Sequence, residues 1–471
     1  MGDHRREAPV DRRSFLMASA AFGGAILGGS PWMSGRAANP MITVASRTIE
    51  VNKTSAEVFG VLGANGKPGL MAQQGDRFSG SMLNASAEPL QMHWHGQVKA
   101  PAEQDRARPG GGALAPEQSD AHDFELTPGT HWMHAHSLSE QQLLAAPMVT
   151  RESNADDVQD VVVMLHDFAF RSPQEILAEL GGNDAHSGHG AGVGVIDRAL
   201  GRTHANDVRY DAYLANDRTL DDPEIVRVEK GGRVRLRIIN GGTATAFFVS
   251  ASGLRTSCIA VDGSPCKPLE QPSYPLAQGQ RIDLILEIPK QGGSFPILAR
   301  VEGARFITGL VLATTGATVN KFNAVSDKPH GMVDLGFERQ LRAIAPLTVK
   351  PPDKKFLVHL GEGPGYRWMI NGRIHGEHVP FDVRQGERVE MTFMNPTTMM
   401  HPMHLHGHHF QVVAIGMMAR RIEGAVRDTI AVPAHTPATV AFDATHKGSW
   451  FLHCHHLYHM ATGMMTEVRI S

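Results

Sequence analysis

The chain has 471 residues, which is long enough for several domains of ordinary size. Its 45 basic and 48 acidic residues leave a formal net charge of −3. Such a balance argues against nucleic acid as a partner, because nucleic-acid-binding domains carry an excess of basic residues.

The N-terminal segment has the features of an export signal. The sequence DRRSFL at 11–16 precedes an apolar run that ends at Gly29, and the small residues Ala37 and Ala38 suit a cleavage site. We expect residues 1–38 to be a twin-arginine signal peptide, which implies the twin-arginine export machinery as a partner and a periplasmic or secreted location. The alternative is a disordered basic start. The run is too short and too rich in glycine to span a membrane, and no other stretch resembles a membrane helix.

An internal repeat divides the remainder of the chain. A Gly-x-Arg sequence followed by asparagine occurs at Gly75, Gly231 and Gly386, and the asparagine lies nine residues after the glycine each time. The period of 156 and then 155 residues is that of a domain. Valine-rich and isoleucine-rich runs between glycine, proline and Asp-Gly turns favour all-β sandwiches with Greek-key connections. We therefore predict three β-sandwich domains over residues 39–155, 156–325 and 326–471.

Four His-x-His pairs occur in the first and third copies of the repeat. Because side chains alternate along a strand, each pair presents both imidazole rings on one face. Imidazole suits copper and other late transition metals, and eight neutral rings would hold about three copper ions. An isolated pair would more simply be a surface or core pair, but four of them argue for a metal cluster at the contact between the first and third domains. The pairs are His93 with His95, His134 with His136, His404 with His406, and His453 with His455.

The middle copy lacks such pairs. Counting from the repeat asparagines, the positions of His404 and His406 correspond to Val249 and Ala251. A second alignment, on the glycine of a Gly-Ser or Gly-Thr turn, places Leu298 and Arg300 where the third copy has His453 and His455. We therefore expect the middle domain to be a spacer without copper ligands.

The third copy also carries a cysteine between two histidines. Cys454 faces away from its two neighbours, and His401, an odd number of residues from His404, can turn to the same side. A cysteine with two histidines and a weak methionine ligand suits a trigonal electron-transfer copper. The sequence therefore predicts a mononuclear site made by His401, Cys454, His459 and Met464.

On these motifs the chain resembles the multicopper oxidases, the family of laccases, bilirubin oxidase and periplasmic cuprous oxidases. The matching sequences are HWHG at 93–96, HAH at 134–136, HPMHLHGHHF at 401–410 and HCHHLYHMATGM at 453–464. The resemblance implies cupredoxin-like domains and four copper ions, with electrons passing from Cys454 to the oxygen-binding cluster through His453 and His455. It implies type 1 ligands His401, Cys454, His459 and Met464, type 2 ligands His93 and His404, and type 3 ligands His95, His134, His136, His406, His453 and His455.

Reduction of dioxygen consumes protons, so an acid near the cluster is expected. By resemblance this acid lies shortly after the HWH sequence, where Glu103 and Asp105 are the candidates; a solvated loop carboxylate is an equally good interpretation of either. Some relatives place a carboxylate directly after the last type 1 histidine, but this chain has Met460 there.

The resemblance leaves the reducing substrate open. A phenolic or aromatic donor, as for laccases, is our first interpretation, and Cu(I) is the alternative because thioethers favour that ion. Core packing is the simpler explanation for most of the methionines. A non-enzymatic cell-envelope protein would have lost ligands, and copper nitrite reduction would not need the type 3 histidines. The methionines in question are Met399, Met400, Met403, Met417, Met418, Met460 and Met465.

Two cysteines lie outside the metal motifs. Cys258 and Cys266 flank the turn Asp262-Gly263-Ser264 and could pair across a hairpin in an oxidising compartment. Two buried thiols are the favoured interpretation, because the geometry of a disulfide is restrictive.

Overall fold

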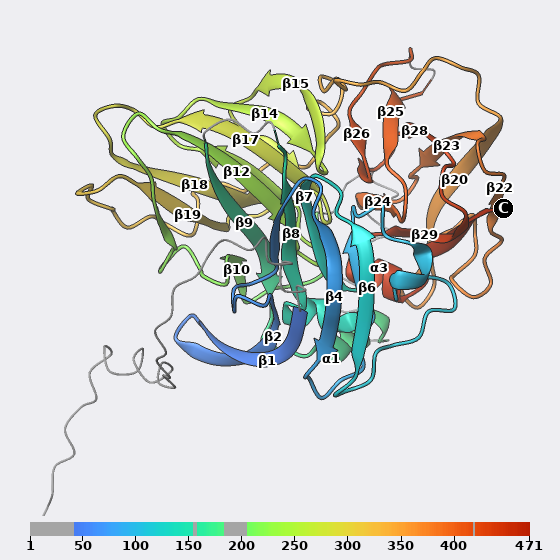
Figure 1. Ribbon diagram of the computed structural model, residues 1–471, viewed down its shortest axis with the longest axis horizontal. Helices are drawn as coiled ribbons and strands as arrows, with labels where there is room; N and C mark the ends of the chain where they lie inside the picture. The colour runs from blue at the N-terminus through green and yellow to red at the C-terminus, as the bar shows by residue number, and fades with distance from the viewer. Residues whose placement is uncertain (1–41, 154–157, 183–204, 418–419) are drawn as a thin grey trace, which may run out of the picture. The chain divides into compact units, whose positions relative to one another are not determined.

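The computed structural model describes residues 42–153, 158–182, 205–417 and 420–471. The predicted export signal therefore lies outside the described residues. Strands dominate the described chain and form six sheets, two in each of three successive sandwiches, so the all-β prediction is confirmed (Figure 1). Among the described residues, no helix combines the length and apolar character needed to cross a bilayer.

The first sandwich consists of two four-stranded sheets. Ile42, Phe78 and Phe124 of one sheet pack against Met92 and Met133 of the other. The first sheet contains β2 (Thr54–Leu62), β1 (Ile42–Val51), β4 (Arg77–Asn84) and β6 (Ser119–Glu125), and the second contains β3 (Leu70–Gln73), β8 (Ala145–Arg151), β7 (Gly129–Ala135) and β5 (Met92–His95). Two short 3-10 helices follow strands of the second sheet: η2 (Ala102–Gln104) and η3 (Leu138–Gln142).

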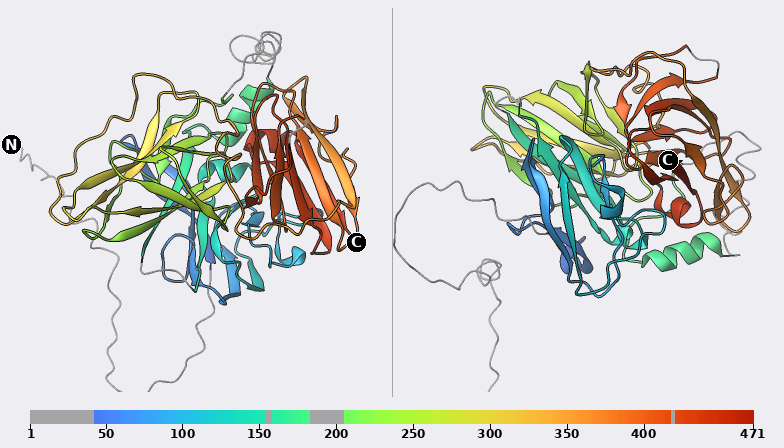
Figure 2. Two further views of the ribbon diagram at one scale, coloured as in Figure 1. Left: turned by 90° about the horizontal axis from the view of Figure 1, so that it is seen from above. Right: turned by 45° about the vertical axis from the view of Figure 1, so that its right-hand side comes forward.

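The middle sandwich pairs a six-stranded sheet with a five-stranded one. The larger sheet contains β10 (Ala212–Ala215), β9 (Gln159–Phe168), β12 (Arg233–Asn240), β17 (Arg281–Glu287), β14 (Thr256–Val261) and β15 (Ser264–Glu270). The smaller sheet contains β11 (Ile225–Arg227), β19 (Ile307–Ala313), β18 (Ser294–Val301), β13 (Phe247–Ala251) and β16 (Tyr274–Leu276). Helix α1 (Pro173–Gly181) begins at a capping box made by Ser172 and Glu175 and lies outside the sheets (Figure 2).

The third sandwich repeats the strand order of the middle one. Its larger sheet contains β21 (Arg367–Ile370), β20 (Lys354–Gly363), β23 (Arg388–Met394), β28 (Ala438–Asp443), β25 (Phe410–Ile415) and β26 (Val426–Arg427). Its smaller sheet contains β22 (Phe381–Val383), β30 (Met465–Ile470), β29 (Gly448–Cys454), β24 (His401–Leu405) and β27 (Thr429–Val432). A short helix, α3 (Leu457–Ala461), follows β29.

The repeated asparagine has the same function in each sandwich. Its side-chain amide donates hydrogen bonds to two backbone carbonyls across the following loop, and its oxygen accepts from a backbone N–H two residues on. Asn84 and Asn395 each bond the carbonyl four residues later, whereas Asn240 bonds Thr245, five residues later. The middle loop is therefore one residue longer.

This longer loop corrects one alignment made from the sequence. His404 pairs with His453, but in the middle sandwich it is Ser250 that pairs with Leu298, and Val249 pairs with Ala299. Ser250 and Ser252, rather than Val249 and Ala251, thus occupy the positions of His404 and His406. Serine replaces imidazole there, so the middle sandwich still offers no histidine pair.

Cys258 and Cys266 face each other across β14 and β15. Both are fully buried free thiols with their sulfur atoms 3.8 Å apart. They lie within the hydrophobic core of the middle sandwich. Their state agrees with the favoured interpretation of two buried thiols.

Candidate metal centres

The end of β29 brings one cysteine and two histidines together. Nδ1 of His401 lies 3.7 Å from Sγ of Cys454, Nδ1 of His459 lies 3.8 Å from it, and the two nitrogens are 3.2 Å apart. None of the three side chains is exposed to solvent. Thr397 Oγ1 lies 2.8 Å from Nε2 of His401 and fixes the orientation of that ring. The arrangement leaves both Nδ1 atoms and the sulfur pointing at one common position.

Aromatic rings enclose His459 on both faces. Trp368 stacks on one face with ring centroids 3.8 Å apart, and His456 stacks on the other at 3.7 Å. Met464 is fully buried in the same hydrophobic cluster as Cys454, and its carbonyl accepts a hydrogen bond from the Cys454 N–H. The predicted mononuclear residues therefore lie together.

All eight residues of the histidine pairs gather in a second cluster. They come from β5, from β7 and the residue after it, from β24 and the loop after it, and from β29 and the residue after it. Strand β24 lies beside β29, and β5 lies beside β7, so each sandwich presents two pairs. The closest nitrogens belong to His406 and His453 at 3.0 Å, His93 and His404 at 3.2 Å, His136 and His453 at 3.2 Å, and His95 and His134 at 3.4 Å.

Most of these rings are oriented by a hydrogen bond from Nδ1. When Nδ1–H donates to an oxygen, the Nε2 lone pair is left for the cluster, which is the usual arrangement behind a metal-binding histidine. Nδ1 donates to Asp105 from His93, to the carbonyl of Ala135 from His134, to that of Asp428 from His404, to that of Ala107 from His406, and to that of Cys454 from His453.

Burial favours the neutral form of several of these rings. It is the largest cause that lowers the pKa of His404, His406 and His136 well below the ordinary value, and neighbouring histidines lower it further. The pKa of His453 falls to about 3 for the same main reason. Nε2 of His455 is also buried, and it has no hydrogen-bond partner. Neutral imidazoles whose lone pairs converge in a buried space fit transition-metal ions.

The two candidate acids are separated by the structure. Asp105 is buried, and its Oδ2 lies 2.7 Å from Nδ1 of His93. Glu103 is exposed on η2 and does not reach the histidines. Of these two acids, Asp105 alone is therefore positioned to act next to the cluster.

A second buried acid, Asp428, was not predicted from the sequence. It lies 3.0 Å from Nε2 of His95, and Arg281 of β17 holds both of its oxygens at 2.7 and 2.6 Å. Burial opposes ionisation of Asp428, but Arg281, with smaller contributions from His409 and His131, lowers the pKa of this carboxyl. The Arg281 side chain also donates to the carbonyl of Thr130 on β7. An arginine of the middle sandwich thus links the first and third sandwiches beside the cluster, so this sandwich supports the cluster without supplying a histidine pair.

Two further acids complete the surroundings. Glu140, on η3, is buried, and its Oε2 lies 3.2 Å from Nδ1 of His134. Asp207, which precedes β10, lies 3.2 Å from Nε2 of His456 and 3.6 Å from Nε2 of His459, and the hydroxyl of Tyr366 donates to it. Although burial opposes ionisation, His456 and His459 lower the pKa of Asp207 well below its ordinary value. No sequence motif marks these acids, because they reach the rings through folding alone.

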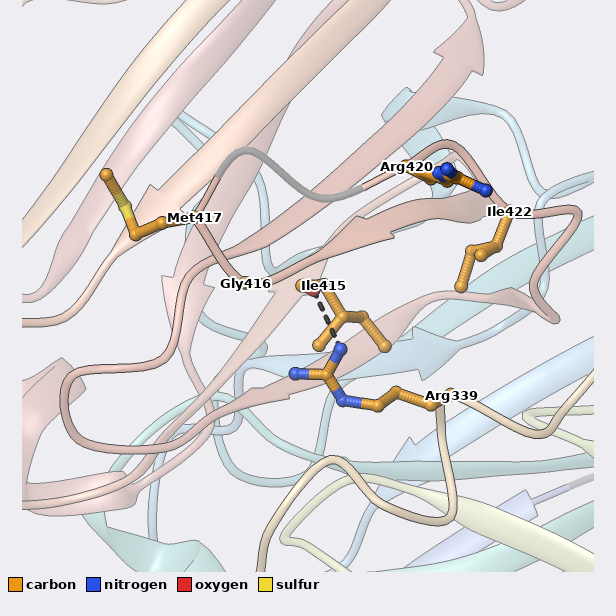
Figure 3. Close-up of a pocket in the computed structure, with 6 residues that line it drawn as sticks. All are labelled: Arg339, Ile415, Gly416, Met417, Arg420 and Ile422. Carbon is orange, nitrogen blue, oxygen red and sulfur yellow. Dashed lines mark hydrogen bonds between the residues drawn. The ribbon is translucent and has the colours of Figure 1, made fainter.

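A surface pocket of about 470 Å³ lies elsewhere on the third sandwich (Figure 3). Arg339 extends below it and donates a hydrogen bond to the carbonyl of Ile415 at 2.9 Å. None of the residues that line it belongs to the two clusters, so this pocket does not mark the metal centres. The lining residues are Arg339, Ile415, Gly416, Met417, Arg420 and Ile422.

Comparison with known proteins gives the family. Three family models, each described as multicopper oxidase, match residues 43–154, 160–319 and 348–471. The chain belongs to the multicopper oxidase family. As a multicopper oxidase it is a copper-dependent oxidoreductase that transfers electrons from a reducing substrate to dioxygen, and the predictions of family and enzyme class are confirmed.

Individual relatives support the same assignment over most of the chain. Multicopper oxidase MmcO of Mycobacterium tuberculosis (strain ATCC 25618 / H37Rv) is 29% identical over 85% of this chain and 81% of its own. Copper resistance protein A of Escherichia coli is 22% identical over 91% of this chain and 92% of its own. The crystal structure of the laccase from Botrytis aclada matches 91% of this chain and 87% of its own with a TM-score of 0.74 and 22% identity. The cupredoxin-like fold of this multicopper oxidase is thereby confirmed.

Proposed function

We propose that this multicopper oxidase is an exported, laccase-like enzyme with one type 1, one type 2 and two type 3 copper ions. The type 1 ion would be held by His401, Cys454, His459 and Met464. Convergence of the predicted side chains into two buried groups is the observation that supports these assignments. The type 2 ion would be held by His93 and His404, and the type 3 pair by His95, His134, His136, His406, His453 and His455.

The copper ions would supply one-electron transfer from the substrate and the reduction of dioxygen to water. The chain supplies the connection between the sites, because the backbone carries Cys454 directly into His453 and His455. It also supplies a proton-binding group, since Asp105 contacts the Nδ1 edge of His93 from outside the cluster. Asp428 and Arg281 keep His95 and His404 in place from the other side.

The surroundings of His459 favour a reducing substrate that carries an ionisable O–H or N–H hydrogen. Nε2 of His459 points toward Asp207, and this nitrogen has no hydrogen-bond partner. A phenol or an aromatic amine can donate its O–H or N–H to the carboxylate as it gives up an electron at the ring. We propose such donors as substrates, with Asp207 as the group that binds them.

Oxidation of Cu(I) is the alternative, and the likeness to copper resistance protein A is what favours it. Met399 and Met403 lie in one hydrophobic cluster, Met400 in a second and Met460 in a third. Such dispersal suits core packing more than a shared soft-metal site. A non-enzymatic envelope protein is the weakest alternative, since none of the twelve ligand residues has been lost.

Rates of oxygen consumption by the copper-loaded enzyme test this proposal. With a phenolic donor, Asp207→Asn should lower kcat/KM by at least about tenfold, because the carboxylate can no longer accept the phenolic proton. Asp222→Asn, at an exposed site of the middle sandwich, should leave the rate unchanged. A wild-type enzyme that oxidises Cu(I) but no phenol or aromatic amine would instead establish the cuprous alternative.

The cellular location is proposed on the N-terminal sequence alone. Residues 1–38 would direct the folded protein through the twin-arginine route to the periplasm or beyond. Replacing Arg12 and Arg13 with lysine should retain the protein in the cytoplasm, which cell fractionation would detect. Unchanged export of that variant would contradict the proposal.

A further inference from the structure

Two histidines outside both metal centres lie together on the surface of the third sandwich. His375 and His378 belong to the sequence HGEH between β21 and β22. Their rings are stacked, with centroids 5.0 Å apart and planes within 8° of each other. His375 is exposed, whereas the His378 side chain is only 10% exposed, so solvent ions can reach the pair from the side of His375. Neither residue belongs to the proposed copper ligands.

A carboxylate completes this group from the neighbouring strand. Oε1 of Glu467, on β30, lies 3.2 Å from Nε2 of His378. Oε2 of the same residue accepts hydrogen bonds from Ser449 at 2.8 Å and from Arg469 at 3.0 Å. These two donors hold the carboxylate in place and leave Oε1 directed at His378. Glu467 is only 8% exposed, so its position is well constrained.

The chemistry of the three side chains matches that of a metal site. Two imidazoles and one carboxylate form a common ligand set for divalent transition-metal ions, with water completing the coordination. Burial, followed by the nearby His378 ring, lowers the pKa of His375, which favours the neutral ring that binds metals. A purely structural function, in which Glu467 fixes the 371–380 loop through His378, would not require His375.

The group lies one aromatic ring away from the histidine cluster. The ring of His375 packs edge-on against Phe451, with centroids 5.6 Å apart. Phe451 in turn stacks on His136 at 5.6 Å and contacts His406 at 5.8 Å. A cation held at His375 would therefore be next to the outer wall of that cluster.

We infer that His375, His378 and Glu467 form an accessory surface site for a divalent transition-metal ion of the imidazole-binding class, such as Zn²⁺ or Cu²⁺. The site is separate from the two proposed copper centres and does not depend on the proposed substrate. The exposed His375 ring can rotate toward an ion at Nε2 of His378, while Gly376 holds His378 through its Nδ1 and Ser449 and Arg469 hold the carboxylate.

Calorimetric titration of Zn²⁺ into the untagged, fully copper-loaded enzyme tests this inference. The wild type should bind one equivalent that the double variant His375→Ala/His378→Ala loses, with affinity reduced by at least about 100-fold. Glu467→Gln should weaken the same binding by about tenfold, because both imidazoles remain. The matched control His359→Ala/His446→Ala removes two exposed histidines of the same sandwich and should bind Zn²⁺ as the wild type does.

The visible spectrum and the melting temperature of each variant show whether the fold and the copper centres are intact. Both should be unchanged in the His375→Ala/His378→Ala variant, because its substitutions lie in a surface loop. The inference is overturned if the wild type takes up no additional Zn²⁺, or if the double variant binds it with the wild-type affinity.

Discussion

The middle and third sandwiches have the same strand order but different chemistry. Strand β18 occupies the place of β29, and β13 occupies that of β24. In the third sandwich His404 and His453 are paired across these strands, whereas in the middle sandwich the paired residues are Ser250 and Leu298. A few side chains on a common scaffold therefore distinguish the sandwich with the proposed copper ligands from the one without histidine pairs. The middle sandwich contributes differently, by sending Arg281 and Asp207 to the edges of the two centres.

The largest effect should come from removing the one thiolate that distinguishes β29. Cys454→Ser should abolish the intense visible thiolate-to-copper band, reduce the copper content by about one ion per chain and bring oxygen consumption to background. Absorption spectroscopy and metal analysis would measure this. Cys258→Ala, which removes a buried thiol of the middle sandwich, should keep the band. A band that survives in Cys454→Ser would refute the assignment of Cys454.

Removing Arg281 tests whether the middle sandwich supports the cluster. Arg281→Leu leaves Asp428 buried without its cation and should lower the free energy of unfolding by about 3–5 kcal/mol. Denaturant titration of the copper-free protein would measure it. Arg255→Leu breaks an exposed ion pair in the same sandwich and should change the stability far less, because solvent screens that pair. Equal losses in the two variants would show that Arg281 has no special importance.

Glu302, the residue that follows β18, should make the stability of the middle sandwich depend on pH. Burial raises the pKa of Glu302 from 4.5 to about 7. The neutral acid is therefore favoured by folding, and its stabilising effect is complete below pH 4.5 and is lost as the pH rises to about 7. The shift corresponds to about 3 kcal/mol between pH 4.5 and 8.

Glu302→Gln keeps the oxygen that accepts from the Val333 N–H and should remove this component of the pH dependence. Unfolding curves between pH 4.5 and about 8 would measure the difference from the wild type. Glu270→Gln, at an exposed position on β15, should retain the full dependence. The same slope in Glu302→Gln and the wild type would contradict the assignment to Glu302.

The smallest effect concerns the acid of the first sandwich. Asp105→Asn should lower oxygen consumption by about 10–100-fold, since it removes a proton-binding group and replaces the charged acceptor of His93 with a neutral amide oxygen. Glu103→Gln should have no effect, because Glu103 is exposed and remote from the rings. Steady-state rates with one donor would distinguish them, and a loss of activity in Glu103→Gln would reverse the choice between these acids.

The fold and the histidine clusters could be predicted from the sequence because they follow from patterns among residues close together in the chain or repeated at a fixed period. The period of the repeat and the alternation of side chains along a strand predict the sandwiches and the facing of the histidine pairs. The domain boundaries and the ligand assignments remain predictions. The longer loop after Asn240 was missed because counting a fixed number of residues from each asparagine does not reveal a one-residue insertion.

The supporting acids could not be predicted for a different reason. Asp428 and Asp207 contact rings that belong to other sandwiches, whereas Glu140 lies only six residues after His134, and none of the three acids lies in a recognisable motif. Arg281 was overlooked because the absence of histidine pairs in the middle copy was taken as absence of any contribution to the centres. Such contacts depend on how the sandwiches pack, and a single sequence does not contain that information.

Copper stoichiometry is the most direct test of the central claim, that β29 joins a mononuclear site to a histidine cluster between the first and third sandwiches. Elemental analysis of the fully loaded wild-type enzyme should give about four copper ions per chain. About one ion per chain at saturation would mean that the eight clustered histidines do not form the proposed trinuclear centre.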